Sequence, residues 1–136
     1  MPNLTANLQL NLQYTGPDSD TVSMPTLYTS APYQAQTHGT IDVPDATASA
    51  TVYAVPFGAI AVDATCGVIE NLTGQPLLLK INGAAAASQS IPTGGSFCWA
   101  NPAVAGSTPI TAMSLTTTAI QSGAGRIVYH LFGDPT

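Results

Sequence analysis

Charged side chains are what this sequence has least of. Only 7% of its 136 residues are Asp, Glu, Lys or Arg, whereas an ordinary domain has about 25%. Thr, Ser, Asn, Gln, Ala and Gly take their place, which predicts a neutral, hydrogen-bonding surface. Such a surface loses its water at little cost, because few ions must be desolvated. This favours a protein that lies against other proteins over a free enzyme, which usually keeps more charge for solubility.

Positive charge is nearly absent. Lys80 and Arg126 are the only basic side chains, against seven acidic ones, and the net charge is −5. Nucleic acids and anionic membranes are therefore excluded as partners, because both normally need a cluster of Lys and Arg. No apolar run is long enough to span a bilayer. The residues after Met1 lack the basic and apolar parts of a secretory signal, so we expect synthesis in a cytoplasm.

Cysteine and histidine are also rare, with two of each. Cys66 and Cys98 match no zinc-binding spacing. Because a cytoplasm is reducing, we expect both cysteines to be buried free thiols. A disulfide between them is the alternative interpretation. The chain has no Gly-x-Ser-x-Gly motif whose serine His38 or His130 could activate as a nucleophile. We therefore expect both histidines to be surface or packed residues.

The acidic residues form no recognisable catalytic or metal site. A glycosidase needs two carboxylates that face one cleft. The candidates nearly all adjoin turns, where Asp normally caps the backbone; they are Asp42, Asp45, Asp63, Glu70 and Asp134. Asp18 and Asp20 have the spacing of a calcium loop without its glycine and closing glutamate. The sequence therefore predicts no enzymatic activity, no metal ion and no cofactor.

β-strand patterning is what the chain has in abundance. Residues 4–14 alternate between apolar and polar side chains, which is the period of a strand. Further strands are expected between clusters of turn residues, at residues 46–55, 59–71, 77–81 and 96–100. With about seven to nine strands and no convincing helix, we predict one all-β domain over residues 1–136. Its expected architecture is an antiparallel β-sandwich.

Residues 21–44 break this pattern. Prolines at 25, 32 and 44 and no clear alternation predict a long loop or arm. Such long loops are uncommon in compact domains unless they bind something, so this segment is a candidate contact arm. The uncharged polar face of residues 4–14 is open to two interpretations: it faces solvent, or it meets another subunit.

Residues 109–134 predict a terminal β-hairpin that turns at residues 121–125. Both faces of its second strand are largely apolar, with Ile127, Tyr129 and Leu131 on one side and Val128, His130 and Phe132 on the other. A strand covered on both sides lies inside a sheet or at an interface. We expect the first set to pack in the core and the second to be covered by a neighbouring chain or by the arm.

One segment points to a family. Glu70-Asn-Leu-Thr-Gly-Gln-Pro-Leu-Leu-Leu-Lys-Ile-Asn-Gly83, followed by a Pro-x-Gly-Gly turn at residues 92–95, resembles a stretch of small structural proteins of tailed bacteriophages. The closing Ser-Leu-Thr-Thr-Thr-Ala and Gly-Ala-Gly-Arg-Ile-Val-Tyr segments are similar to the C-terminal hairpin of the same group. The resemblance covers roughly residues 47–136 and consists of turn and strand patterning. It implies a virion component with a jelly-roll or related β-sandwich fold.

Size and low charge make a capsid cement, or decoration, protein the most similar member of that group. The resemblance then implies a homo-oligomer, dimer or trimer, on the outer capsid surface, which bridges subunits of the major capsid protein. Synthesis would take place in the host cytoplasm. Weak contacts would add up by multivalency, and an exposed strand such as residues 4–14 could extend a neighbour's sheet.

Two other functions stay open. One is a phage tail, baseplate or fibre component. The other is a small carbohydrate-binding β-sandwich with Trp99, Tyr28 and Tyr33 as candidate sugar-stacking residues, although the position of Trp99 within a strand favours core packing. For the assembly function, the candidate interface residues are Leu4, Leu8, Leu10, Tyr14, Tyr28, Tyr33, Val128, His130 and Phe132.

Overall fold

The structure is a computed structural model that describes residues 4–10, 13–15, 21–23, 27–100 and 108–135. Those residues form twelve β-strands and no helix. The strands are β1 Leu4–Leu10, β2 Gln13–Thr15, β3 Thr21–Ser23, β4 Leu27–Tyr33, β5 Ala35–Val43, β6 Val52–Ala54, β7 Asp63–Leu72, β8 Leu77–Ile81, β9 Gln89–Ile91, β10 Ser96–Ala100, β11 Met113–Thr117 and β12 Gly125–Asp134. The predicted all-β class is confirmed. A helix that is both long and apolar enough to cross a membrane is not found in these ranges.

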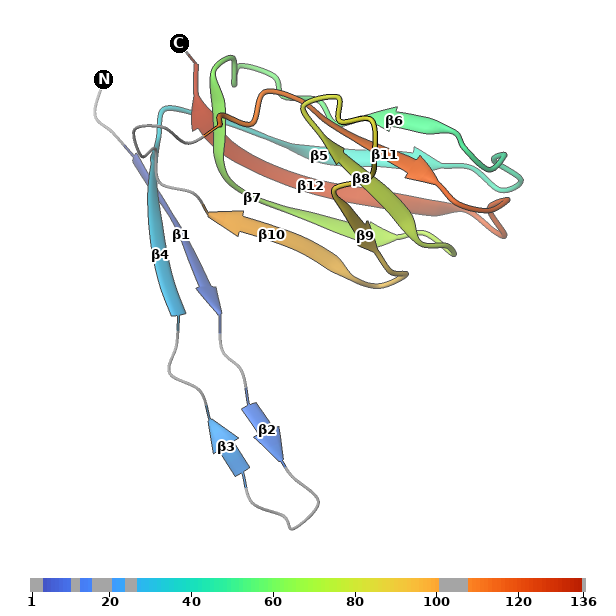
Figure 1. Ribbon diagram of the computed structural model, residues 1–136, viewed down its shortest axis with the longest axis horizontal. Coiled ribbons are helices and arrows are strands. Elements are labelled where there is room, and N and C mark those ends of the chain that lie inside the picture. Colours follow the sequence, from blue (N-terminus) through green and yellow to red (C-terminus); the bar gives the residue numbers. More distant parts are fainter. Residues whose placement is uncertain (1–3, 11–12, 16–20, 24–26, 101–107, 136) are drawn as a thin grey trace.

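Eight of the strands form two antiparallel sheets of four strands each. Sheet I has the order β10-β7-β12-β5, and sheet II has the order β6-β11-β8-β9. The chain passes from one sheet to the other at every connection from β5 to β12 except β8–β9, which joins two neighbouring strands of sheet II. The two sheets lie face to face in Figure 1, and this arrangement is compatible with the predicted β-sandwich.

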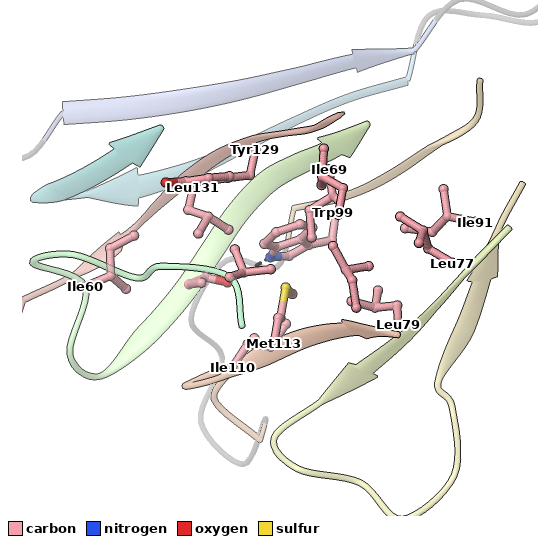
Figure 2. Packing of buried hydrophobic residues seen from close by; sticks show 14 of the residues in the cluster. Ile60, Ile69, Leu77, Leu79, Ile91, Trp99, Ile110, Met113, Tyr129 and Leu131 are labelled. Atoms are coloured by element: carbon pink, nitrogen blue, oxygen red, sulfur yellow. Dashed lines mark hydrogen bonds between the residues drawn. The ribbon is translucent and has the colours of Figure 1, made fainter. Parts of the chain in front are cut away.

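The two sheets enclose one hydrophobic core. Its side chains come from alternate positions of the strands, as the period of a pleated sheet requires. Figure 2 shows Ile69, Trp99, Tyr129 and Leu131 of sheet I directed toward Leu77, Leu79 and Met113 of sheet II. Each fully buried Leu or Ile contributes about 1.5–3 kcal/mol of transfer free energy. The predicted inward face of β12, Ile127, Tyr129 and Leu131, is confirmed because all three side chains are buried.

Two aromatic rings of the core lie over glycines. The Trp99 ring covers the position where a Cβ on Gly67 would stand, and the Tyr129 ring does the same at Gly39. The indole Nε1 of Trp99 donates a hydrogen bond of 2.8 Å to the carbonyl oxygen of Ala64. The predicted core position of Trp99 is therefore confirmed, and its one polar atom is satisfied.

Most predicted turns are present. Asn82 and Gly83 both have positive φ, 53° and 67°, and Ala84 donates its backbone N–H to Ile81 to close the turn. This is the conformation that an Asn-Gly pair favours. The Pro-x-Gly-Gly turn is closed by the Gly95 N–H on the Pro92 carbonyl at 2.9 Å, with Gly94 at a φ of 73°.

The predicted terminal hairpin is wrong. β11 pairs with β6 and β8 in sheet II, whereas β12 pairs with β5 and β7 in sheet I. β11 already ends at Thr117, so the connection is longer than a hairpin loop and carries the chain across the end of the two sheets. Turn residues such as Gly123, with a φ of 74°, can reverse the chain both in a hairpin within one sheet and in a connection between two sheets. They do not determine which strands then pair.

The predicted strand over residues 46–55 is mostly wrong, because only Val52–Ala54 is a strand. Ala46 and Ala50 both have a φ of 62°, a left-handed conformation that no regular strand contains. Thr47 and Thr51 donate their hydroxyls to backbone carbonyls three residues back, at 2.7 and 2.8 Å. Such local hydrogen bonds compete with sheet pairing and favour turns.

The predicted irregular loop over residues 21–44 is also wrong wherever the structure describes it. β5 pairs along its full length with β12, β4 pairs with β1, and β3 pairs with β2. Pro32 is tolerated in β4 because β1 and β4 form a two-stranded sheet with two open edges. We call β1 and β4 the N-terminal hairpin; in Figure 1 it projects from sheet I, and β2 and β3 continue it.

Candidate functional site

The face of sheet I that points away from the core carries mostly neutral side chains. The strand registers align its side chains in rows across β10, β7, β12 and β5. One row is Cys98, Val68, His130 and His38, and the next is Ser96, Glu70, Val128 and Thr40. We call this surface the outer face.

The N-terminal hairpin covers one end of the outer face. The Phe132 ring packs edge-on against Tyr33 of β4, with 4.9 Å between the ring centroids and an angle of 64° between the planes. Ala6 and Cys66 are buried in the same small cluster. Phe132 is half-buried by this packing within a single chain, so part of the cover predicted for this strand comes from the chain's own β1 and β4.

The rest of the outer face is not covered by the chain's own described residues. Val128 is half-buried and His130 is exposed. His130 stands directly opposite His38 of β5, and the two rings are stacked with centroids 5.7 Å apart and an interplanar angle of 11°. Sequence alternation placed Val128 and His130 on one face, but the nearness of His38 depends on the β5–β12 register and could not be read from it.

The remaining predicted interface residues lie in the N-terminal hairpin and its continuation. Leu8 is half-buried. The side chains of Leu4, Leu10, Tyr14 and Tyr28 lie outside the described part of the structure. Their backbones pair with Tyr33, Leu27, Val22 and Gln9 respectively. The structure therefore brings Tyr33 and Phe132 together, whereas Val128 and His130 lie farther along the outer face.

Of the described carboxylates, Asp63 and Asp134 stand opposite each other in the β7–β12 register. Asp45 accepts the Gly123 N–H at 2.7 Å, and Asp63 accepts the Ile110 N–H at 2.8 Å, so both cap backbone as predicted. Glu70 is exposed on the outer face. The described residues contain no group of three or more His, Cys, Asp or Glu side chains that could hold a metal ion.

Both cysteines are free, but only Cys66 is buried, so the prediction of two buried thiols is wrong for Cys98. They lie on neighbouring strands, where Cys66 faces Ala100 and Cys98 faces Val68. Burial raises the pKa of the Cys66 thiol, with a further increase from the neighbouring Cys98, and partial burial raises the pKa of the Cys98 thiol, with a further increase from Glu70. Since the thiolate is the reactive form, neither is activated as a nucleophile.

A buried polar cluster at one end of the two sheets was missed by the sequence analysis. It consists of Asn71, Thr73, Gln75 and Gln121. Asn71 donates its amide to the carbonyls of Gln75 and Ile91 at 2.9 and 3.0 Å, and its oxygen accepts the N–H and hydroxyl of Thr73. Gln75 in turn donates to Gln121 at 3.2 Å. Alternate polar residues directly after a strand were the available signal, and they were interpreted only as a turn.

This cluster has a structural role. Asn71 is fully buried, so its Asn-Leu-Thr sequon is inaccessible to a glycan. The hydrogen bonds join the segment between β7 and β8 to the segments after β9 and after β11. Residues 70–83 therefore include side chains that hold the two sheets together at one end.

The candidate sugar-stacking aromatics are not exposed together. Trp99 is 6% exposed and lies in the core, and Tyr33 packs against Phe132. The side chain of Tyr28 is outside the described residues. A shallow hollow of about 480 Å³ at the far end of the outer face is lined by Asp42, Leu72, Ala124, Gly125 and Arg126, without an aromatic ring.

Comparisons with known proteins identify no family for the chain: no protein-family model and no curated protein matches it.

Proposed function

We propose that the chain is a non-enzymatic virion structural protein, a capsid cement or decoration protein that bridges and stabilises subunits of the major capsid protein. It would be made in the host cytoplasm and would act on the outer capsid surface. The observation that carries this proposal is the outer face, a four-stranded layer of mostly neutral side chains that, among the described residues, the chain's own hairpin covers at one end only. Such a layer can be desolvated against another protein at low cost.

The connections between the sheets support a jelly-roll fold. Each of the four strands of sheet I is joined in sequence to a strand of sheet II, and the two orders are β10-β7-β12-β5 and β6-β11-β8-β9. An eight-stranded double sheet with crossing connections is the arrangement of jelly rolls, which occur in viral capsid proteins and in lectins. Fold alone does not assign a function, so the fold agrees with the proposal without singling it out.

The mechanism is multivalent. A cement protein gains strength by touching several subunits at once, since each later contact is intramolecular. In Figure 1 the N-terminal hairpin projects away from sheet I, which carries the outer face. Together they offer separate surfaces for separate capsid subunits.

An open strand edge supports self-association. β5 is the end strand of sheet I and is nine residues long. Within the described residues, its backbone has hydrogen bonds only with β12. It contains neither Lys nor Pro, two residue types that commonly protect such edges. A second copy could pair antiparallel with it about Gly39, which would keep the inward side chains of both copies on the same side and give a dimer.

A matched pair of valine variants tests the proposal. Val128→Lys adds a charge to the outer face, and Val52→Lys adds the same charge to sheet II, where Val52 is 62% exposed. We expect Val128→Lys to weaken binding to purified virions that lack the protein by about tenfold or more, since a charge buried at an interface is costly. Val52→Lys should leave binding within about twofold, because surface substitutions are usually nearly neutral.

Equal effects of the two variants would contradict the role of the outer face. The position in the particle is tested separately, by imaging virions that carry the labelled protein. Label at the tail tip would refute the cement function and support the tail, baseplate or fibre alternative. The carbohydrate alternative has lost its main candidate, because Trp99 is in the core, and it would need binding in a glycan screen that Tyr28→Ala abolishes.

A further inference from the structure

His38 and His130 are the only two histidines of the chain, and the fold places them side by side. They are a directly opposite pair in the β5–β12 register. Side chains in this position have Cβ atoms about 4.5–5.5 Å apart. The rings are exposed and nearly parallel, with centroids 5.7 Å apart. Nine consecutive residue pairs hold β5 to β12 around them, so the backbone keeps the two side chains at a fixed spacing.

The described part of the chain gives neither imidazole a further partner. Among the described residues, no hydrogen bond or ion pair engages a ring nitrogen of His38 or His130. Their nearest neighbours on the outer face carry no charge, namely Gln36, Thr40, Val68, Val128 and Phe132. Glu70 faces Val128 and is therefore diagonal to His130, and Asp42 and Arg126 face each other two rows away. The ring nitrogens are thus free to bind a ligand.

We propose that His38 and His130 form a two-histidine site for a borderline divalent transition-metal ion such as Zn²⁺, Ni²⁺ or Cu²⁺. Imidazole nitrogen suits these ions and binds Zn²⁺ at about 2.0–2.1 Å. Exposed side chains change rotamer within nanoseconds, so the two rings can tilt one nitrogen each toward a shared ion. Water, or a group from a bound partner, completes the coordination. The net charge of −5 favours cation binding in general.

The site has a defined selectivity. Mg²⁺ and Ca²⁺ prefer oxygen ligands, so they should not compete for two imidazoles. Cu²⁺ should bind more tightly than Ni²⁺ or Zn²⁺, following the usual order of divalent affinities. Acid should weaken binding, because a protonated imidazole cannot be a ligand. The inference does not depend on the proposed capsid function, and each can fail without the other.

The test is a titration of tag-free, full-length protein with ZnCl₂, followed by calorimetry and by the NMR signals of the two imidazole rings. We expect one Zn²⁺ per chain and simultaneous shifts of both rings. His38→Ala and His130→Ala should each weaken binding by about tenfold or more, the loss expected when a ligand set is broken. Gln36→Ala and Thr40→Ala are matched controls on the same exposed face and should bind as the parent does. Cys98→Ser removes the nearest exposed thiol and should also leave binding unchanged.

Three results would overturn the proposal. The first is no heat and no ring shift at millimolar Zn²⁺. The second is binding that persists in the double variant His38→Ala, His130→Ala. The third is loss of binding in only one of the two single variants, which would indicate a ligand set other than this pair. Because both histidines are exposed on a regular sheet, their removal should not prevent folding, and Trp99 fluorescence verifies that the variants are folded.

Discussion

Replacement of Asn71 by Ala is the sharpest test of how the two sheets are held together. The Asn71 amide donates to the carbonyls of Gln75 and Ile91, and its oxygen accepts both donors of Thr73. Asn71 is fully buried, so water cannot replace these bonds without opening the structure. An orphaned buried polar group costs about 1–3 kcal/mol. With the Thr73 N–H and the Ile91 carbonyl left without this partner, we expect a loss of about 3–5 kcal/mol in the free energy of unfolding.

A loss of that size would be a large part of the total, which for a domain is about 5–15 kcal/mol. Urea unfolding followed by tryptophan fluorescence measures it directly, because Trp99 is the only tryptophan and is buried in the core. Gln89→Ala is the control: its amide is exposed and makes only a long hydrogen bond of 3.4 Å to the carbonyl of Ser90. Its cost should stay within about 0.5 kcal/mol. If Asn71→Ala also lost less than about 1 kcal/mol, the buried hydrogen bonds would not be holding the sheets together.

Three further predictions concern packing and pH. Phe132→Ala removes the aromatic contact with Tyr33, so β1 and β4 should exchange amide hydrogens faster by about tenfold, which mass spectrometry measures, with sheet II unchanged. Gly67→Ala forces a methyl group into the Trp99 ring, and urea unfolding should show a loss of about 1–3 kcal/mol. Burial raises the pKa of the Cys66 thiol, so as pH rises this thiol loses its proton in the unfolded chain before it does so in the folded one. The free energy of unfolding should therefore fall above about pH 8.5. Cys66→Ala should reduce that fall.

The local structure of the sheets was largely predictable, because alternation and turn residues act over a few positions. Residues 77–81 and 96–100 are strands as predicted, and the Asn82–Gly83 turn has the positive φ angles that its residue types favour. Pairing over longer distances was not predictable in the same way. The connection after Thr117 has the composition of a hairpin loop, but β11 pairs with β8 in sheet II and β12 pairs with β7 in sheet I.

In the candidate site, too, the local features were predictable and the contacts between distant strands were not. Alternation in β12 separated the buried Ile127, Tyr129 and Leu131 from Val128, His130 and Phe132, and the structure has the same division. The stacking of His38 on His130 follows only from the register of β5, a segment predicted to be irregular. The buried polar cluster was not predicted: Asn71 was expected at the end of the strand over residues 59–71 and Gln75 in the turn that follows it, but both are buried, and the Asn71 amide donates to the Gln75 carbonyl.

The strand order of sheet I has a consequence for how the chain folds as it is synthesised. β12 lies between β5 and β7, although it is the last of the twelve strands to leave the ribosome. β5 therefore has no partner in its own sheet until β12 has been made, and β7 has only β10. Pairing of distant strands is slow, and an unpaired β5 is exposed to other nascent chains in the meantime. We expect this sheet to form only after β12 has been synthesised, and shortening of β12 to cause aggregation even where the other eleven strands are intact.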